Sequence, residues 1–297
     1  MDNLAAKKRK NKAAKIVIAI FRTILIFGLC YVILKPFLIK ILLGFFGKTD
    51  MLDATVKYIP KNWSIYYWQW AWKHLKLSTA GVNSLVLALG SSLLQVFVSV
   101  FVGYGLARFK FKGNTLLFGG VIATLLIPPQ IYSTAQYLTF AKIIPIRNTY
   151  IPVYLLAILG LTVKEGLYIY LMREFFKGMP KDLENAAYVD GASVMRTFFT
   201  VMLPNAFNMM ITVFLFAFSW QWTDYSFETT YMPEITTLPM TLYQRTFLLH
   251  KQTTEDTVGT NIARGCGIMI IIAPLVILAI VCQKFLVKSI SQSGLAN

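Results

Sequence analysis

Charged and hydrogen-bonding residues are unevenly spread in this chain, which is 56% hydrophobic with a mean hydropathy of +0.58. Lys164 and Glu165 lie side by side inside an apolar run, where a charge is costly and therefore suggests a function. Gln221, Trp222 and Asp224 end another run and combine an indole face with amide and carboxylate groups. A sugar requires both kinds of surface. We therefore predict that these five residues line a solute pathway.

Both groups also have structural interpretations, and these alternatives stay open. Lys164 and Glu165 would neutralise each other in a packed helix, or the lysine would extend toward the membrane surface. Adjacent helical residues point about 100° apart, so the two cannot easily share one partner. Trp222 would instead belong to the belt of aromatic residues that membrane proteins place at the bilayer surface.

The sequence does not indicate an enzyme or a metal site. The histidines, His74 and His250, fall in segments that we expect outside the membrane. The chain has no H-E-x-x-H or G-x-S-x-G motif, and its Gly-Lys-Thr at 47–49 lacks the preceding glycine of a P-loop. We therefore predict no catalytic residue, no metal site and no cofactor bound by this chain.

A polar stretch at 179–204 connects two apolar runs and predicts two short helices joined by a bend. The first helix would carry Leu183, Ala186 and Ala187 on one face, because they recur at the spacing of a helical turn. Gly191 would form the bend, since glycine adopts left-handed backbone conformations that other residues resist.

This stretch resembles the cytoplasmic EAA loop of the membrane subunits of bacterial ABC importers. The family pattern is E-A-A, three residues, Gly, nine residues, then I-x-L-P. The chain keeps this spacing with Ala186, Ala187, Gly191, Leu203 and Pro204. The surrounding P-K-D-L-E-N-A-A-Y-V-D-G-A-S is similar to the maltose-type second permease of carbohydrate importers.

One position departs from the family pattern. The motif glutamate is replaced by Asn185, and Glu184 lies one residue earlier, about 100° around the helix. In the family this loop docks in a groove of the ATPase subunit and transmits its closure. The resemblance therefore implies an ATPase-coupling loop formed by Leu183, Glu184, Asn185, Ala186, Ala187, Asp190, Gly191, Leu203 and Pro204.

Weaker matches extend the resemblance over most of residues 60–295, including Y-G-L-A-R-F-K-F-K-G and Q-K-F-L-V-K. The resemblance implies a heterodimer with a second permease, an ATPase dimer that binds ATP and Mg, and an extracytoplasmic solute-binding protein. The implied function is import of a sugar or oligosaccharide by alternating access. The alternatives are the same machine with a non-sugar solute such as a peptide, and a self-contained secondary transporter, although no inverted repeat is visible.

The apolar runs predict an all-α polytopic membrane protein, because a bilayer-spanning helix needs about 20 residues. Pro36 is expected to kink or end the first span, and Pro128-Pro129 to break the third. One transmembrane domain would cover 16–288, with the coupling loop at 173–204. The six expected spans are 16–34, 82–107, 116–137, 151–171, 205–225 and 262–282.

The net charge of +16 invites a nucleic-acid interpretation, but Lys and Arg are scattered over the ends and loops of the apolar runs. That distribution is typical of membrane topology signals. Residues 1–15 form a basic arm expected in the cytoplasm, against anionic lipid, and 289–297 a cytoplasmic tail. We therefore predict a multi-pass membrane protein with both termini cytoplasmic and no nucleic-acid partner. The family resemblance implies that the membrane is the bacterial cytoplasmic membrane.

An external segment at 50–78 is rich in aromatic residues, including Trp63, Trp68 and Trp72. These side chains would form an aromatic belt at the lipid headgroups. Alternatively they would form a platform for sugar rings or for a docking protein.

Overall fold

The computed structural model describes the backbone of residues 2–51, 53, 55–249 and 256–294, and the side chains of 15–51, 53, 55–244 and 258–287. These residues form helices and no strand, which confirms the predicted all-α class. In chain order, with η marking a π-helical turn, the elements are α1 (Asp2–Leu43), α2 (Tyr66–His74), η1 (Leu77–Gly81), α3 (Val82–Arg108), α4 (Asn114–Leu126), α5 (Pro129–Leu138), η2 (Thr139–Ile143), α6 (Ile151–Ile158), α7 (Glu165–Gly178), α8 (Asp182–Val189), α9 (Val194–Thr197), η3 (Phe198–Met202), α10 (Leu203–Asn205), α11 (Phe207–Thr223), α12 (Ser226–Tyr231), α13 (Leu238–Leu249) and α14 (Asp256–Gly294).

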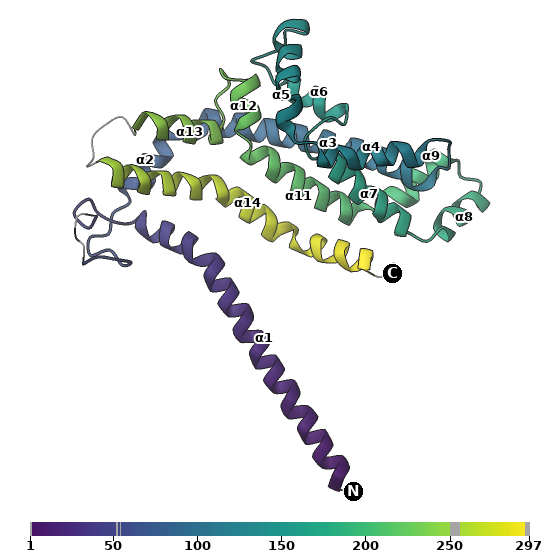
Figure 1. The fold of residues 1–297 in the computed structure, drawn as a ribbon, viewed down its shortest axis with the longest axis horizontal. Coiled ribbons are helices and arrows are strands. Elements are labelled where there is room, and N and C mark those ends of the chain that lie inside the picture. The colour runs from purple at the N-terminus through teal and green to yellow at the C-terminus, as the bar shows by residue number, and fades with distance from the viewer. Residues whose placement is uncertain (1, 52, 54, 250–255, 295–297) are drawn as a thin grey trace. The chain divides into compact units, whose positions relative to one another are not determined.

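The chain forms two compact units, Met1–Lys73 with Thr246–Ile270, and His74–Arg245 with Ile271–Asn297. The first unit contains the long helix α1 (Figure 1). The helix continues through Pro36 to Leu43, so this proline does not end it. Its apolar side chains are exposed, with Phe27 73% accessible. Such a surface requires lipid or another chain to cover it.

The small core of the first unit forms where α2 meets the beginning of α14. Tyr67 and Ala71 pack there against Ile262 and Cys266. Gly44 lies so close to this cluster that an added Cβ would be 2.6 Å from Trp68 Nε1. The aromatic side chains of the predicted segment 50–78 therefore differ in burial. Some of them, such as Tyr67, are in this core, whereas others, such as Trp63 and Trp72, are exposed.

Helix α3 is the centre of the second unit and packs against α6, α7 and α11. The crossing with α7 is close because Gly103 has no side chain, and an added Cβ would lie 2.7 Å from Met172 Cβ. Small residues allow this kind of approach between membrane helices. The core around the crossing contains Val100, Tyr104, Tyr168, Met172, Phe176, Phe198, Met202 and Val213.

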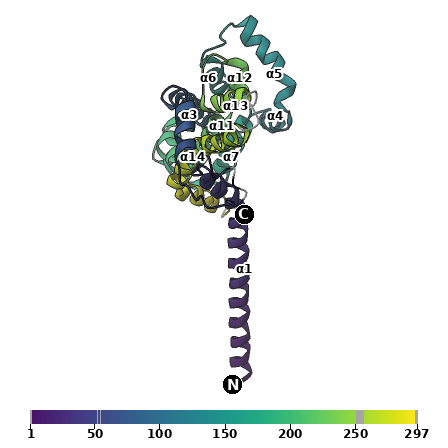
Figure 2. The ribbon, with the colours of Figure 1, turned by 90° about the vertical axis from the view of Figure 1, so that its left-hand side faces the viewer.

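The third predicted span is broken at the two prolines, as expected. Helix α4 and the helical stretch that begins at Pro129 meet at 95°, a turn that is visible in Figure 2. Pro128 has an extended backbone that ends α4, and Pro129 begins α5 at a position where a missing N–H costs nothing. Residues 116–137 therefore do not form one straight span.

The fourth predicted span, 151–171, is wrong as a continuous helix. Helix α6 ends at Ile158, and α7 begins only at Glu165. Gly160 has a φ of 70°, Gly160 N–H donates to Ala157 O at 3.2 Å, and Leu161 N–H donates to Leu156 O at 2.8 Å. This is the Schellman motif, in which a left-handed glycine terminates a helix.

The two-helix loop predicted around Gly191 is confirmed as local structure. Helix α8 ends in the same motif as α6, because Gly191 has a φ of 79° and Ala192 N–H donates to Ala187 O at 2.9 Å. Ser193 then caps α9 by accepting from the Arg196 N–H. The chain continues through η3 and α10 and bends by 71° before α11.

The six predicted membrane crossings are not confirmed by the lengths and apolar composition of the helices. Helix α14 contains Pro274 and includes the predicted sixth span. Residues 250–255, between the fifth and sixth predicted spans, and residues 295–297 of the predicted tail lie outside the described residues. Among the described residues, the helices long and apolar enough to cross a bilayer cover Lys15–Leu43, Leu77–Arg108 and Val258–Val287, and two bent pairs would raise that number to at most 5. Six spans therefore stay a prediction.

Candidate functional site

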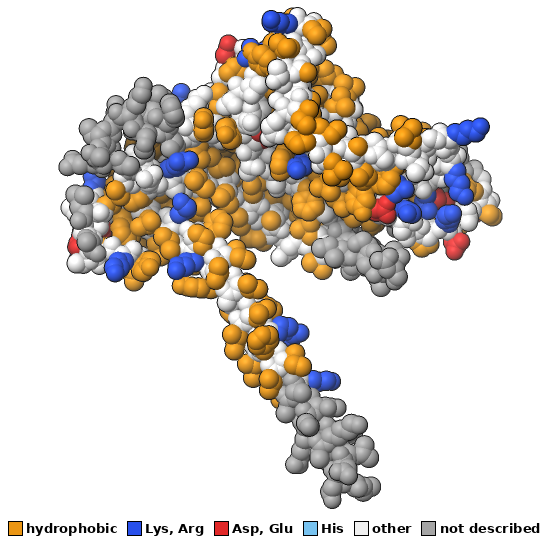
Figure 3. All heavy atoms as spheres, viewed as in Figure 1, with side chains coloured by type: hydrophobic (Ala, Val, Ile, Leu, Met, Phe, Trp, Pro, Cys, Tyr) orange, Lys and Arg blue, Asp and Glu red, His pale blue; other side chains and the backbone are white. Residues whose placement is uncertain are grey.

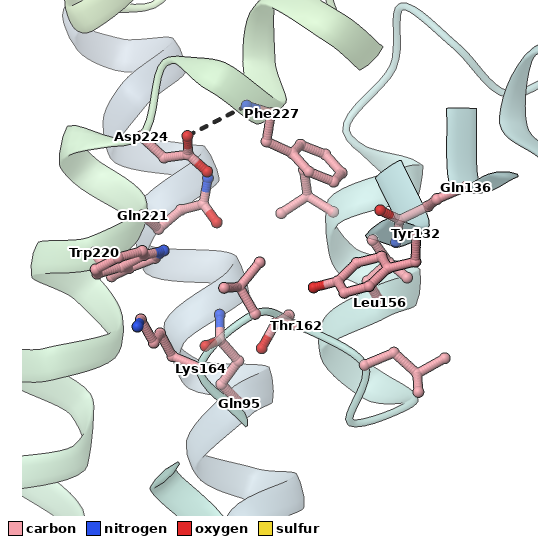
Figure 4. A pocket seen from close by; sticks show the side chains of 13 residues that line it. Gln95, Tyr132, Gln136, Leu156, Thr162, Lys164, Trp220, Gln221, Asp224 and Phe227 are labelled. Atoms are coloured by element: carbon pink, nitrogen blue, oxygen red, sulfur yellow. Dashed lines mark hydrogen bonds between the residues drawn. The ribbon is translucent and has the colours of Figure 1, made fainter. Parts of the chain in front are cut away.

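A pocket in the second unit brings together polar groups from several helices (Figure 4). It contains about 480 Å³ of empty space, including its open mouth. The non-helical segment between α6 and α7 contributes to its wall, so the Schellman motif at Gly160 helps to form the pocket. The lining residues are Gln95, Tyr132, Gln136, Val153, Leu156, Leu161, Thr162, Val163, Lys164, Trp220, Gln221, Asp224 and Phe227.

The end of α11 supplies one side of this pocket with Trp220, Gln221 and Asp224. Asp224 is the first residue after the helix, and its Oδ1 accepts from the backbone N–H groups of Ser226 at 2.9 Å and Phe227 at 3.2 Å. These bonds hold the carboxylate at the junction with α12. Two of the residues predicted from this run, Gln221 and Asp224, are therefore pocket residues.

Lys164 is the residue immediately before α7, and its side chain reaches the pocket. Its Nζ lies 4.4 Å from the centre of the Trp220 ring, a cation–π arrangement. The ion pairs found among the described side chains do not include Lys164. The alternative in which Lys164 and Glu165 neutralise each other is therefore wrong.

Glu165 does not line the pocket, contrary to its predicted position. The residue is fully buried, and its Oε2 accepts from Thr162 Oγ1 at 3.0 Å. Because α7 begins at Glu165, the side chain is turned into the helical core while Lys164 stays in the preceding segment. Glu165 thus holds the segment before α7 through Thr162.

Trp222 is also placed differently from its prediction. It is 5% exposed, its Nε1 donates to Ile271 O at 2.9 Å, and its ring stacks on Phe218. Two helical positions correspond to about 200°, so Trp220 and Trp222 point in nearly opposite directions. The pocket tryptophan is Trp220, and its i, i+4 spacing from Asp224 was the signal that could have identified it.

The sequence prediction also missed Gln95, Tyr132 and Gln136, which come from α3 and α5. Tyr231 Oη donates to Gln136 Oε1 at 3.2 Å and so positions that amide. Tyr132 and Gln136 are four residues apart and therefore lie on one helical face. The completed pocket combines amide and hydroxyl groups with aromatic rings, which suits a polyhydroxylated ligand with apolar ring faces.

A second candidate site is the outer surface of α8 and α9, which we call the α8–α9 surface. Exposed apolar residues cover it, including Leu183, Val189 and Met195, and Val189 is 88% accessible. Asn185, Ala186 and Asp190 are exposed there as well. Lys and Arg side chains gather at this end of the second unit (Figure 3). Exposed apolar groups within a polar rim are typical of a protein-binding surface.

Glu184 faces away from the α8–α9 surface, although the family resemblance includes it in the ATPase-coupling loop. Its carboxylate pairs with Arg108 Nε at 3.2 Å and accepts from Tyr104 Oη at 2.9 Å. Arg108 Nη2 also donates to Met179 O at 2.8 Å, just before α8. Glu184 therefore anchors α8 to the end of α3.

Leu203 and Pro204 lie beyond the two short helices. They form the single turn of α10, immediately before the 71° bend into α11. Pro204 is exposed and Leu203 is half-buried. These two residues connect the α8–α9 region to a long core helix.

Comparison with known proteins identifies the family. Residues 95–293 match the family model for the binding-protein-dependent transport system inner membrane component. The chain is 25% identical over 261 residues to the probable ABC transporter permease protein YurM of Bacillus subtilis (strain 168), covering 87% of this chain and 82% of YurM.

Two further relatives have names that refer to carbohydrates. The chain is 26% identical to the probable starch degradation products transport system permease protein AmyC of Thermoanaerobacterium thermosulfurigenes, covering 86% of this chain and 89% of AmyC. It is 28% identical to the galactooligosaccharides transport system permease protein GanQ of Bacillus subtilis (strain 168), covering 78% of this chain and 75% of GanQ.

The fold is also that of a solved structure. A chain of a bacterial ABC transporter involved in the import of the acidic polysaccharide alginate matches with a TM-score of 0.73 at 16% identity. The match covers 90% of this chain and 96% of that chain.

Proposed function

Since this chain belongs to the family of binding-protein-dependent transport system inner membrane components, we propose that it is the membrane subunit of an ATP-driven importer of a sugar or oligosaccharide. As a member of this family it is a transport subunit, and it is a multi-pass protein of the cytoplasmic membrane. The observation that carries the sugar proposal is the pocket, in which an exposed tryptophan stands beside several amide groups.

The chemistry of the pocket supports this solute class. Trp220 is 48% exposed and offers an apolar surface to the face of a sugar ring. Gln95, Gln221 and Tyr132 offer donors and acceptors to its hydroxyl groups. Sugar recognition combines such ring contacts with directed hydrogen bonds, because each sugar has apolar faces and a polar edge.

In the proposed mechanism, partner proteins hydrolyse ATP, deliver the solute and complete the membrane pathway. A second permease would complete the membrane pathway, and an extracytoplasmic solute-binding protein would deliver the sugar. An ATPase dimer, with ATP and Mg bound to it, would dock on the α8–α9 surface. This chain would bind no cofactor itself. Closure of the ATPases would move α8, and the Glu184–Arg108 pair would transfer that movement to α3.

The distribution of basic residues supports a proposed orientation in the membrane. Lys110, Lys112, Lys177 and Lys181 are exposed near the α8–α9 surface. Basic residues at the ends of membrane helices favour the cytoplasmic side. We therefore place this surface in the cytoplasm together with both termini, and the pocket toward the solute pathway.

The proposal is tested with the complete complex in proteoliposomes. Uptake of labelled oligosaccharides should require both ATP and the binding protein, and Trp220→Ala should reduce it without loss of any subunit. Uptake without ATP would instead indicate a secondary transporter. Uptake of peptides alone would refute the sugar assignment.

A further inference from the structure

The pocket contains one cation and one carboxylate among its lining side chains, and their surroundings differ. Asp224 already accepts two backbone hydrogen bonds at the start of α12. Lys164 lies at the other end of the same wall, with Trp220 and Gln221 between the two groups (Figure 4). One carboxylate oxygen of Asp224 is therefore held by backbone N–H groups, whereas the Lys164 ammonium faces the pocket.

No described carboxylate forms an ion pair with Lys164. Glu165 follows it in the chain but is turned into the core toward Thr162. The Trp220 ring accommodates the ammonium at 4.4 Å, but a ring contributes no net negative charge. A charged side chain in the membrane region that lacks an ion-pair partner usually marks the pathway of a substrate or ion.

We infer that Lys164 selects a carbohydrate that carries a carboxylate, so that the importer takes up a uronic-acid-containing oligosaccharide. This inference rests on the proposed function of the pocket in sugar transport. A sugar ring against the exposed Trp220 brings a carboxylate on that ring next to the ammonium. The resulting hydrogen bond between two ions is stronger than one to a neutral hydroxyl.

The charges of the pocket favour a carboxylate over a phosphate group. A phosphate monoester carries a charge of about −1.5 to −2 near neutral pH. Lys164 is the one cation among the lining residues, and Asp224 would repel a dianion more strongly than it repels a single carboxylate. A single carboxylate matches the single ammonium.

The test compares matched pairs of labelled oligosaccharides in proteoliposomes that contain the whole importer. Uronic oligosaccharides of glucose, galactose and mannose are paired with neutral oligosaccharides of the same linkage and length. Each pair differs only at C6. The measured quantity is the ratio of acidic to neutral uptake, with the same binding protein throughout, so that a change between variants is due to this chain.

The native complex should prefer the acidic member of a pair. Lys164→Gln should lower the acidic-to-neutral ratio by about tenfold or more, the loss expected for one charged hydrogen bond. Lys164→Arg should retain the preference because it keeps the charge. The control is Lys142→Gln, which removes an equal charge from an exposed site outside the pocket and should leave the ratio unchanged.

Three results would overturn the inference. The first is that the native complex prefers the neutral sugars. The second is that Lys164→Gln reduces the uptake of both members of a pair equally. The third is that the second permease is lost from the purified Lys164→Gln complex. The last would show that the lysine pairs with a partner carboxylate. If neither set is taken up, the proposed sugar function itself fails, which is a distinct outcome.

Discussion

The carboxylate of Glu184 pairs with the Arg108 guanidinium at 3.2 Å, so the first short helix of the α8–α9 region is joined to the last residue of α3. Both side chains are nearly buried, with 10% of Glu184 and 6% of Arg108 accessible. Tyr104 adds a hydrogen bond from one turn earlier on α3. A displacement of α8 therefore acts directly on the helix at the centre of the second unit.

Glu184→Gln is expected to uncouple ATP hydrolysis from uptake. The variant keeps an acceptor for Tyr104 but leaves Arg108 without a counter-charge, at a cost of about 3–5 kcal/mol if the site stays closed. The readout is solute transported per ATP hydrolysed. Glu234→Gln removes an exposed carboxylate after α12, outside the α8–α9 surface, and is the control that should couple normally. A double-mutant cycle with Arg108→Gln should show strong interaction, and additive effects would refute the anchoring role.

Gly191→Ala should weaken association with the ATPase while leaving membrane insertion intact. The backbone φ of 79° costs a residue with a Cβ about 1–2 kcal/mol, although the added methyl group would meet no other atom. Gly119→Ala is the matched control. An added Cβ at Gly119 also meets no atom within 4 Å, but this glycine lies inside α4 and has no positive φ. Gly191→Asn should be milder, since asparagine tolerates this conformation. Pull-down of the ATPase distinguishes the three variants, and equal binding by all would contradict the prediction.

The two tryptophans near the end of α11 should respond in different ways to replacement by alanine. Trp220→Ala should reduce uptake at normal expression, because the side chain faces the pocket. Trp222→Ala should instead lower the thermal stability of the complex, since removal of a buried aromatic side chain costs about 3–5 kcal/mol. Uptake and melting temperature are measured on the same preparations. A reversed result would place Trp222 in the pathway.

Glu165→Gln should assemble and transport nearly as well as the native chain. The glutamine oxygen can still accept from Thr162, and no ion pair among the described side chains is lost. Thr162→Val is the companion variant and should do more harm, because it leaves the buried carboxyl unpaired. Loss of uptake in Glu165→Gln without loss of assembled complex would instead show that this carboxyl takes part in the pathway.

Cysteine labelling tests the proposed orientation. In a variant without native cysteines, single cysteines at Lys7 and Ser293 should resist an impermeant thiol reagent in intact cells. A cysteine at Lys57 should react, since its segment is expected on the outer side. Labelling of the cysteine at position 7 or 293 only after permeabilisation would support a cytoplasmic location of both termini. Labelling of either cysteine in intact cells would contradict that location.

Features that depend on neighbouring residues in the chain were predictable. The bend at Gly191 and the break at Pro128-Pro129 are set by local backbone preferences, and both occur as expected. The interruption between α6 and α7 was missed for a definable reason. The apolar run concealed the left-handed Gly160, whose surrounding residues resemble an uninterrupted span.

The sequence by itself determined that the chain is helical and membrane-embedded, because apolar runs of this length must pair their own backbone groups in lipid. It also determined the helix–glycine–helix segment before α11. The tertiary structure alone decided that Trp220 rather than Trp222 faces the pocket, and that Glu184 turns inward to Arg108. The physical reason is that burial depends on which helices pack together, and the partners here, α3 with α8 and α11, are far apart in the chain.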